Sequence, residues 1–132
     1  MEDTLFWLYL INAVILIVHE IDSAYWNEWE MFRLPGGVTA FLLLHVPLIA
    51  LFLYGLVLVD RGAPAGYTLS LALGLAGVIA FAIHTSFSRQ GRVEFRTPVS
   101  QAILWSTLLL SVAQLGVTLV TVVAGGKPVA GG

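Results

Sequence analysis

The 132-residue sequence contains no cysteine and few charged residues. The lack of cysteine excludes a disulfide-framed secreted module and a zinc–thiolate site. Asp, Glu, Lys and Arg make up 11% of the chain, against about 25% in an ordinary soluble domain. So few charges cannot cover the surface of a water-soluble fold, which argues against a soluble enzyme. The 58% of apolar residues indicates instead that the protein is dissolved in lipid.

Basic residues are scarce as well. Six Lys and Arg stand against eight Asp and Glu, and the formal net charge is -2. Since the six are spread along the chain, no basic patch is available to hold phosphates, and nucleic-acid binding has no support. The length fits one small domain, so we expect residues 1–132 to form a single transmembrane domain.

Long stretches without formal charge predict the membrane spans, because a bilayer is crossed by about 20 apolar residues. Three stretches exceed this length, between Arg33 and Asp60, between Arg61 and Arg89, and between Arg96 and Lys127. The first apolar stretch, residues 4–18, is only about 22 Å long as a helix, so this helix must continue through His19. We therefore predict four transmembrane helices at about residues 4–32, 36–59, 65–88 and 98–124.

Short connections between these four spans predict an all-α, up-down antiparallel bundle. The chain opens Met1-Glu2-Asp3, without the basic region of a signal peptide, so we expect the first helix to be retained. Orientation follows from the basic residues of the short loops. One side carries Arg33, Arg89, Arg92 and Arg96, and the other carries Arg61 and Lys127. We therefore expect both termini outside and the four-Arg side in the cytoplasm.

The three histidines lie on three different predicted helices, near the same membrane face. At 1.5 Å per residue, His84 lies about 6 Å and His45 about 13 Å from that face, and His19 belongs to the same half of the first helix. Asp22 shares a helical face with His19, whereas Glu28 falls on the opposite side of a continuous helix. The predicted site therefore comprises His19, Asp22, His45 and His84, with Glu20 or Glu30 as further members.

Ionisable groups inside a membrane are costly and mark functional sites by default. Imidazole with carboxylate suits zinc or non-haem iron, and two histidines on facing helices could instead ligate a haem. The same groups could relay protons, since histidine titrates near neutral pH. In a purely structural alternative, each histidine hydrogen-bonds a neighbouring helix or the headgroups. If the histidines share one metal, His45→Ala and His84→Ala should each abolish its binding.

A polar seam follows one face of the fourth predicted helix. It comprises Ser100, Thr107, Ser111, Gln114, Thr118 and Thr121. Such residues usually hydrogen-bond between helices, although a seam through the full membrane depth could also line a conduit. Asn12 lies near the depth of Gln114 and is its expected partner. We favour the packing interpretation.

Several segments carry a resemblance to a known family. They are His19-Glu20-Ile21-Asp22, Trp26-Asn27-Glu28-Trp29-Glu30-Met31-Phe32, Leu34-Pro35-Gly36-Gly37, His45 and Ile83-His84-Thr85. On these residues the chain resembles a family of small four-helix bacterial membrane proteins of unknown function. More distantly it is similar to the membrane proteins named for a His-x-x-Glu-Glu motif, in whose place this chain has His19-Glu20-Ile21-Asp22. The resemblance implies the four-span fold and the bacterial inner membrane, and no activity.

The leading hypothesis is a membrane protein with a zinc or iron site made by His19, Asp22, His45 and His84, with haem as a less favoured cofactor. As an enzyme it would act on a membrane lipid or another lipophilic small molecule, the metal activating water or oxygen, with Glu20 as the catalytic base. The alternatives are a proton-coupled transporter and an accessory subunit without chemistry. A bundle this small can dimerise, but no residue indicates it.

Overall fold

The computed structural model describes residues 2–125, and the elements it assigns in that range are all helices. These are α1 (Glu2–Tyr25), α2 (Glu28–Met31), α3 (Gly37–Asp60), α4 (Pro64–Arg89) and α5 (Pro98–Gly125). Lys127, which enters the count of basic residues, lies outside the described residues.

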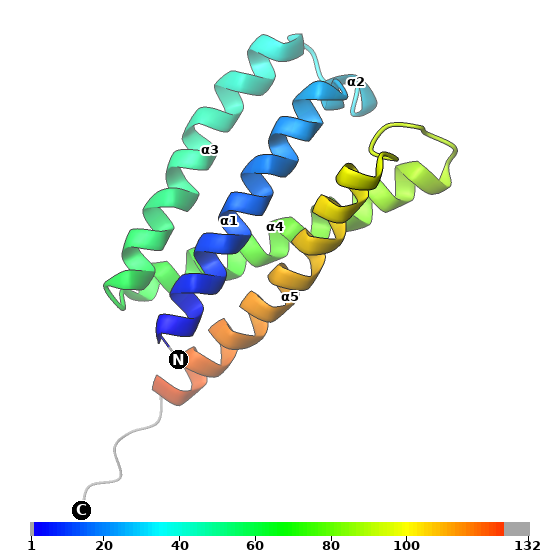
Figure 1. The fold of residues 1–132 in the computed structure, drawn as a ribbon. Helices are drawn as coiled ribbons and strands as arrows, with labels where there is room; N and C mark the ends of the chain where they lie inside the picture. The colour runs from blue at the N-terminus through cyan, green and yellow to red at the C-terminus, as the bar shows by residue number, and fades with distance from the viewer. Residues whose placement is uncertain (1, 126–132) are drawn as a thin grey trace, which may run out of the picture.

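Four of these helices are long and apolar enough to cross a membrane, α1 from Asp3 onward and the whole of α3, α4 and α5. The shortest of the four spans has 23 residues, about 34 Å at 1.5 Å per residue, which exceeds the roughly 30 Å of a bilayer's hydrocarbon core. They run alternately up and down (Figure 1). The predicted all-α membrane protein with a four-helix bundle is confirmed.

The bundle has two distinct ends. At one end α1 leads into α2 and α3, and the end of α4 turns into the start of α5; this is the α2 end (Figure 1). At the other end lie the start of α1 and the turn between α3 and α4. Each long helix packs mainly on two others, α1 on α3 and α5, and α4 on the same two. All three histidine-bearing helices therefore reach the α2 end.

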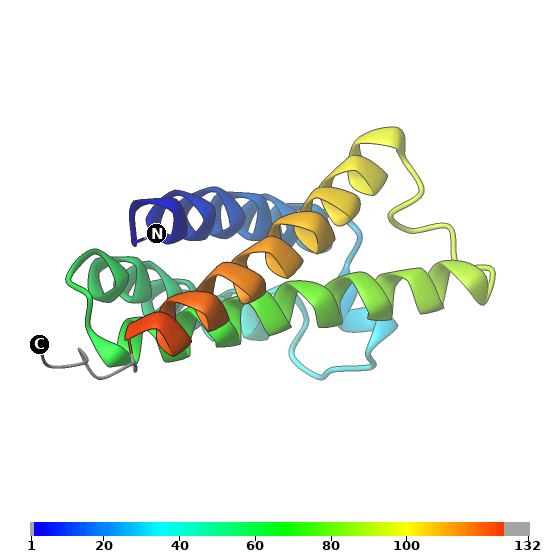
Figure 2. The same cartoon turned by 90° about the horizontal axis from the view of Figure 1, so that it is seen from below.

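Small residues let α5 cross α4 at close range, obliquely as Figure 2 shows. A Cβ at Gly77 would collide with the Ser111 side chain, and one at Gly74 would lie 2.7 Å from Leu115 Cγ. Lipid supplies no hydrophobic drive between helices, so close backbone approach of this kind holds them together through van der Waals packing.

The polar seam of α5 is buried inside the bundle. Asn12 Nδ2 of α1 donates hydrogen bonds to Gln114 Oε1 at 2.9 Å and to Ser111 Oγ at 3.1 Å. Gln114 Nε2 in turn donates to Ser70 O and Ser70 Oγ of α4, both at 3.0 Å. The expected pairing of Asn12 with Gln114 is thus present, and the seam joins three helices, as the packing interpretation predicts.

The helix expected over residues 4–32 is divided in two. It ends at Tyr25, and Asn27 adopts a left-handed conformation with φ 53° and ψ 51° before the four-residue helix α2 begins at Glu28. Asn tolerates this region better than most residues, so the chain can turn there at little cost. The turn changes the direction in which every later side chain points, including that of Glu28.

Candidate metal centre

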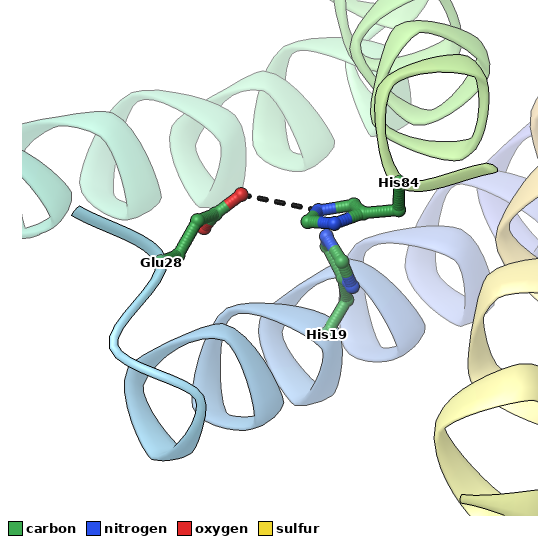
Figure 3. Close-up of side chains that lie close together, drawn as sticks. All are labelled: His19, Glu28 and His84. Carbon is green, nitrogen blue, oxygen red and sulfur yellow. Dashed lines mark ion pairs between the residues drawn. The ribbon is translucent and has the colours of Figure 1, made fainter. Parts of the chain in front are cut away.

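Three titratable side chains from three helices meet near the α2 end: His19 of α1, Glu28 of α2 and His84 of α4 (Figure 3). Each offers one ligand atom, and these atoms lie within 4.8 Å of one another. The two imidazole rings meet edge to face, with centroids 4.8 Å apart. His19 is 1% exposed and His84 is 3% exposed, so this cluster is shielded from the surroundings of the bundle.

The two histidines are only partly satisfied. His84 Nε2 contacts Glu28 Oε1 at 3.1 Å. The Nδ1 atoms of His19 and His84 are both buried without a hydrogen-bond partner. A buried polar atom left without a partner costs about 1–3 kcal/mol, and few are found in native proteins. Two of the six such atoms among the described residues lie in this one cluster.

Glu28 lies outside the spanning segments, in the connection between α1 and α3. Burial opposes the ionisation of its carboxyl group, but the hydrogen bond and charge of His84, together with smaller effects of Ser23 and His19, outweigh that effect and hold the pKa of Glu28 below its ordinary value. At neutral pH the group is therefore an anion held against a buried imidazole. Carboxylate with imidazole is a donor set that divalent transition metals accept.

Phe95, from the connection between α4 and α5, covers the two imidazoles. Its ring centroid lies 4.2 Å from that of His84 and 6.0 Å from that of His19, and it is 2% exposed. The residue has a φ of 64°, a conformation that costs a non-glycine residue free energy and persists only where the surroundings enforce it. The hydrogen bond from Gln101 Nε2 to Phe95 O, at 2.7 Å, is one such restraint, and the ring keeps water from the cluster on this side.

His45 belongs to a separate pair. His45 Nε2 lies 2.8 Å from Glu20 Oε2, and His45 Nδ1 lies 2.6 Å from the carbonyl oxygen of Phe41. A carbonyl only accepts hydrogen bonds, so Nδ1 carries a hydrogen. The short contact to Glu20 is therefore a second hydrogen bond, between the other imidazole nitrogen and an oxygen of the Glu20 carboxyl group.

A cavity of about 460 Å³ lies between α1, α2 and the start of α3. Its polar wall is formed by Glu20, His45 and Glu28, and its remaining lining is apolar and aromatic, with Trp29 and Phe41 among it. Glu28 thus belongs both to the buried cluster and to this cavity. A molecule in the cavity would reach the cluster at the carboxylate of Glu28.

The residues predicted from sequence are distributed over three places. His19 and His84 lie together in the cluster; Glu20 and His45 form the neighbouring pair. Asp22 Oδ1 accepts a hydrogen bond from Trp26 Nε1 at 3.1 Å, and Glu30 is exposed. Within residues 2–125, the cluster is the one group of three such side chains whose ligand atoms come this close.

The placement of Glu28 opposite His19 was wrong, because it assumed one helix through residue 32. The left-handed conformation of Asn27 turns the chain, so that the Glu28 side chain contacts His84. Asn27 itself was the available signal, since Asn is enriched at such positions. Nothing in the sequence pattern marks Phe95, whose role depends on the path of a loop.

Comparison with protein families finds one match, over residues 5–121, to a family described as being of unknown function, DUF6713. No curated protein and no solved structure matches the chain.

Proposed function

The chain belongs to this family of unknown function, and from the geometry of its site we propose that it is a membrane metalloprotein in which His19, His84 and Glu28 hold one zinc or iron ion. The observation that carries the proposal is the pair of buried, unpartnered imidazole nitrogens beside the carboxyl group of Glu28. Metal binding would supply the partner that these nitrogens lack.

The donor set supports zinc or ferrous iron. Two histidines and one carboxylate bind zinc in several hydrolytic enzymes and bind iron in non-haem oxygenases. In both classes three protein ligands leave a position open for water or substrate. Metal–ligand bonds of about 2.0–2.2 Å would draw the three side chains inward from their present separation, which lies within 4.8 Å. A haem between His19 and His84 is less well supported, because their ring centroids are 4.8 Å apart.

The cavity supports a catalytic use of such a metal. Its wall includes Glu28, a proposed ligand, and Glu20, whose carboxyl group is hydrogen-bonded to His45. Glu20 is therefore the candidate general base for water or substrate at the open position, and the metal would lower the pKa of bound water or polarise the substrate. The arginines of the loops at the α2 end favour a cytoplasmic position for the site, in the inner membrane of a bacterium.

Elemental analysis of detergent-purified protein, carrying an affinity tag without histidine, tests the proposal. We expect about one zinc or iron per chain in the wild type, and a loss of most of it in His84→Ala, because a ligand is removed. His45→Ala is the matched control, since it removes an imidazole at the same end of the bundle but outside the cluster, and it should keep its metal.

A metal-free wild type, or full occupancy in His84→Ala, would overturn the proposed centre. A metal-free wild type would favour the structural alternative, in which the two His–Glu pairs only form contacts between helices. Loss of metal in both His→Ala variants would mean that His45 is also a ligand, as its depth in the membrane predicts.

A further inference from the structure

Glu20 and His45 lie on the walls of two cavities. The first is the cavity of about 460 Å³ that reaches Glu28. The second is a narrow cleft of about 70 Å³ between α1 and α3, with α4 as its floor. Since the same two side chains line both, the two spaces adjoin at the Glu20–His45 pair.

The cleft is apolar apart from that pair. It runs along α3 from His45 to Leu53, about 12 Å at 1.5 Å per residue, and is closed on the α4 side by Leu73 and Ala76. A space of about 70 Å³ spread over this length admits one alkyl chain rather than the two chains of a phospholipid. Because the cleft follows α3, it runs from the α2 end toward the middle of that span; Figure 1 shows the course of α3.

The charges restrict the head of such a molecule. The carboxylates of Glu20 and Glu28 face the wider cavity, and no Lys or Arg lines either space in the described part of the chain. Glu28 would therefore repel an anionic head group before metal is bound. A cationic one would be repelled by the divalent ion that the proposed function places at Glu28. A hydroxyl or carbonyl head meets neither penalty: a hydroxyl donates a hydrogen bond to a carboxylate, and the oxygen of either head can bind a metal.

We propose that the adjoining cavities form one binding site for an uncharged single-chain amphiphile, with its alkyl chain in the cleft and its hydroxyl or carbonyl oxygen beside Glu20 and Glu28. This inference rests on the proposed function for the choice of head group, and names the substrate class of the same site. The alkyl chain of the amphiphile would enter the cleft laterally from the lipid, between α1 and α3.

The experiment uses a single-chain aliphatic alcohol that carries a photoactivatable diazirine, added to the metal-stripped protein in detergent. Labelled peptides are mapped by mass spectrometry, with and without an excess of the unlabelled alcohol. We expect labelling of the cleft residues of α1 and α3 that the excess alcohol suppresses, whereas labelling of lipid-facing positions such as Leu109 persists.

Ala76→Leu fills the cleft and should weaken saturable labelling about tenfold or more, because chain methylenes lose their buried contact. Ala82→Leu is the matched control: the same substitution on the same helix, at an exposed position, should label like the wild type. Circular dichroism and gel filtration establish that both variants fold.

Labelling of the cleft that excess alcohol does not suppress, or equal suppression in Ala76→Leu, would overturn the proposed site. Equally strong competition by the carboxylic acid of the same chain length would overturn the uncharged head group. Because the protein is free of metal throughout, these results do not depend on the proposed metal centre. A failure of the metal centre would appear in elemental analysis and in the response of thermal unfolding to metal, neither of which the labelling uses.

Discussion

Two groups of buried polar side chains lie at different levels of the bundle, and they are satisfied to different degrees. The central network consists of Asn12, Ser70, Ser111, Gln114 and Thr118. Its members bond one another across α1, α4 and α5, and Thr118 Oγ1 lies 2.8 Å from Ser70 Oγ. The candidate metal centre consists of His19, Glu28 and His84, and in it two ring nitrogens have no partner.

The two groups also differ in the kind of side chain from which they are built. The central network is built from amides and hydroxyls, which keep one protonation state and can satisfy each other completely. The candidate metal centre is built from titratable groups that can also ligate a cation. The central network satisfies its own hydrogen bonds, whereas two nitrogens of the candidate metal centre have no partner within the protein. The predictions that follow test this contrast.

The largest effect should come from adding metal. A ligand that binds only the folded protein stabilises it by about 2.7 kcal/mol at a concentration of 100 Kd. Zinc or ferrous iron added to the metal-stripped wild type should therefore raise the thermal unfolding midpoint, measured by circular dichroism in detergent. His84→Ala should show no such rise. Asn12→Ala, which alters the central network alone, should show the full rise from a lower starting point.

An equal response to metal in His84→Ala and the wild type would contradict this assignment, because the stabilising ion would then bind elsewhere. A chelator added to the loaded wild type gives the reverse test, and should return the midpoint to that of the stripped protein.

Gln114→Leu should have the next largest effect, and on stability alone. Its amide makes three hydrogen bonds to Asn12 and Ser70, at about 0.6 kcal/mol for each bond between helices in a membrane. A loss of about 2 kcal/mol in unfolding free energy is therefore expected, measured by denaturant titration. Metal content should not change, and a metal-free Gln114→Leu that remains folded would show that the two groups are coupled.

The fold could be predicted from the sequence because each span is indicated by its own residues, independently of the others. Long charge-free stretches predicted the four spans, and the spacing of polar residues along the last one predicted a buried seam. The partner of Gln114 was also predictable, since depth in a membrane is set by residue count from a span end. Asn12 was the amide residue at the matching depth.

The site could be predicted only in part, because depth does not fix direction. His19, His45 and His84 do lie toward the α2 end, but rotation about each helix axis decides which of them meet. His45 lies against Glu20, whereas the ring of His19 points toward that of His84 (Figure 3). The carboxylate of the cluster depended on a single left-handed residue, Asn27, and no periodicity continues through such a turn.

The smallest effect should distinguish two threonines of α5 that are equally buried. The Thr118 hydroxyl bonds Ser70 Oγ and the carbonyl of Gln114, whereas the Thr107 hydroxyl has no hydrogen-bond partner. Thr118→Val should therefore lower the unfolding free energy by about 1 kcal/mol, from two bonds of about 0.6 kcal/mol each. Thr107→Val removes a polar atom that gains nothing in the folded state, so it should leave stability unchanged or raise it slightly. Denaturant titration of the two variants side by side measures the difference.

Equal losses of unfolding free energy would mean that burial, rather than hydrogen bonding, sets the contribution of this seam to stability. The contrast between the central network and the candidate metal centre would then lose its energetic basis.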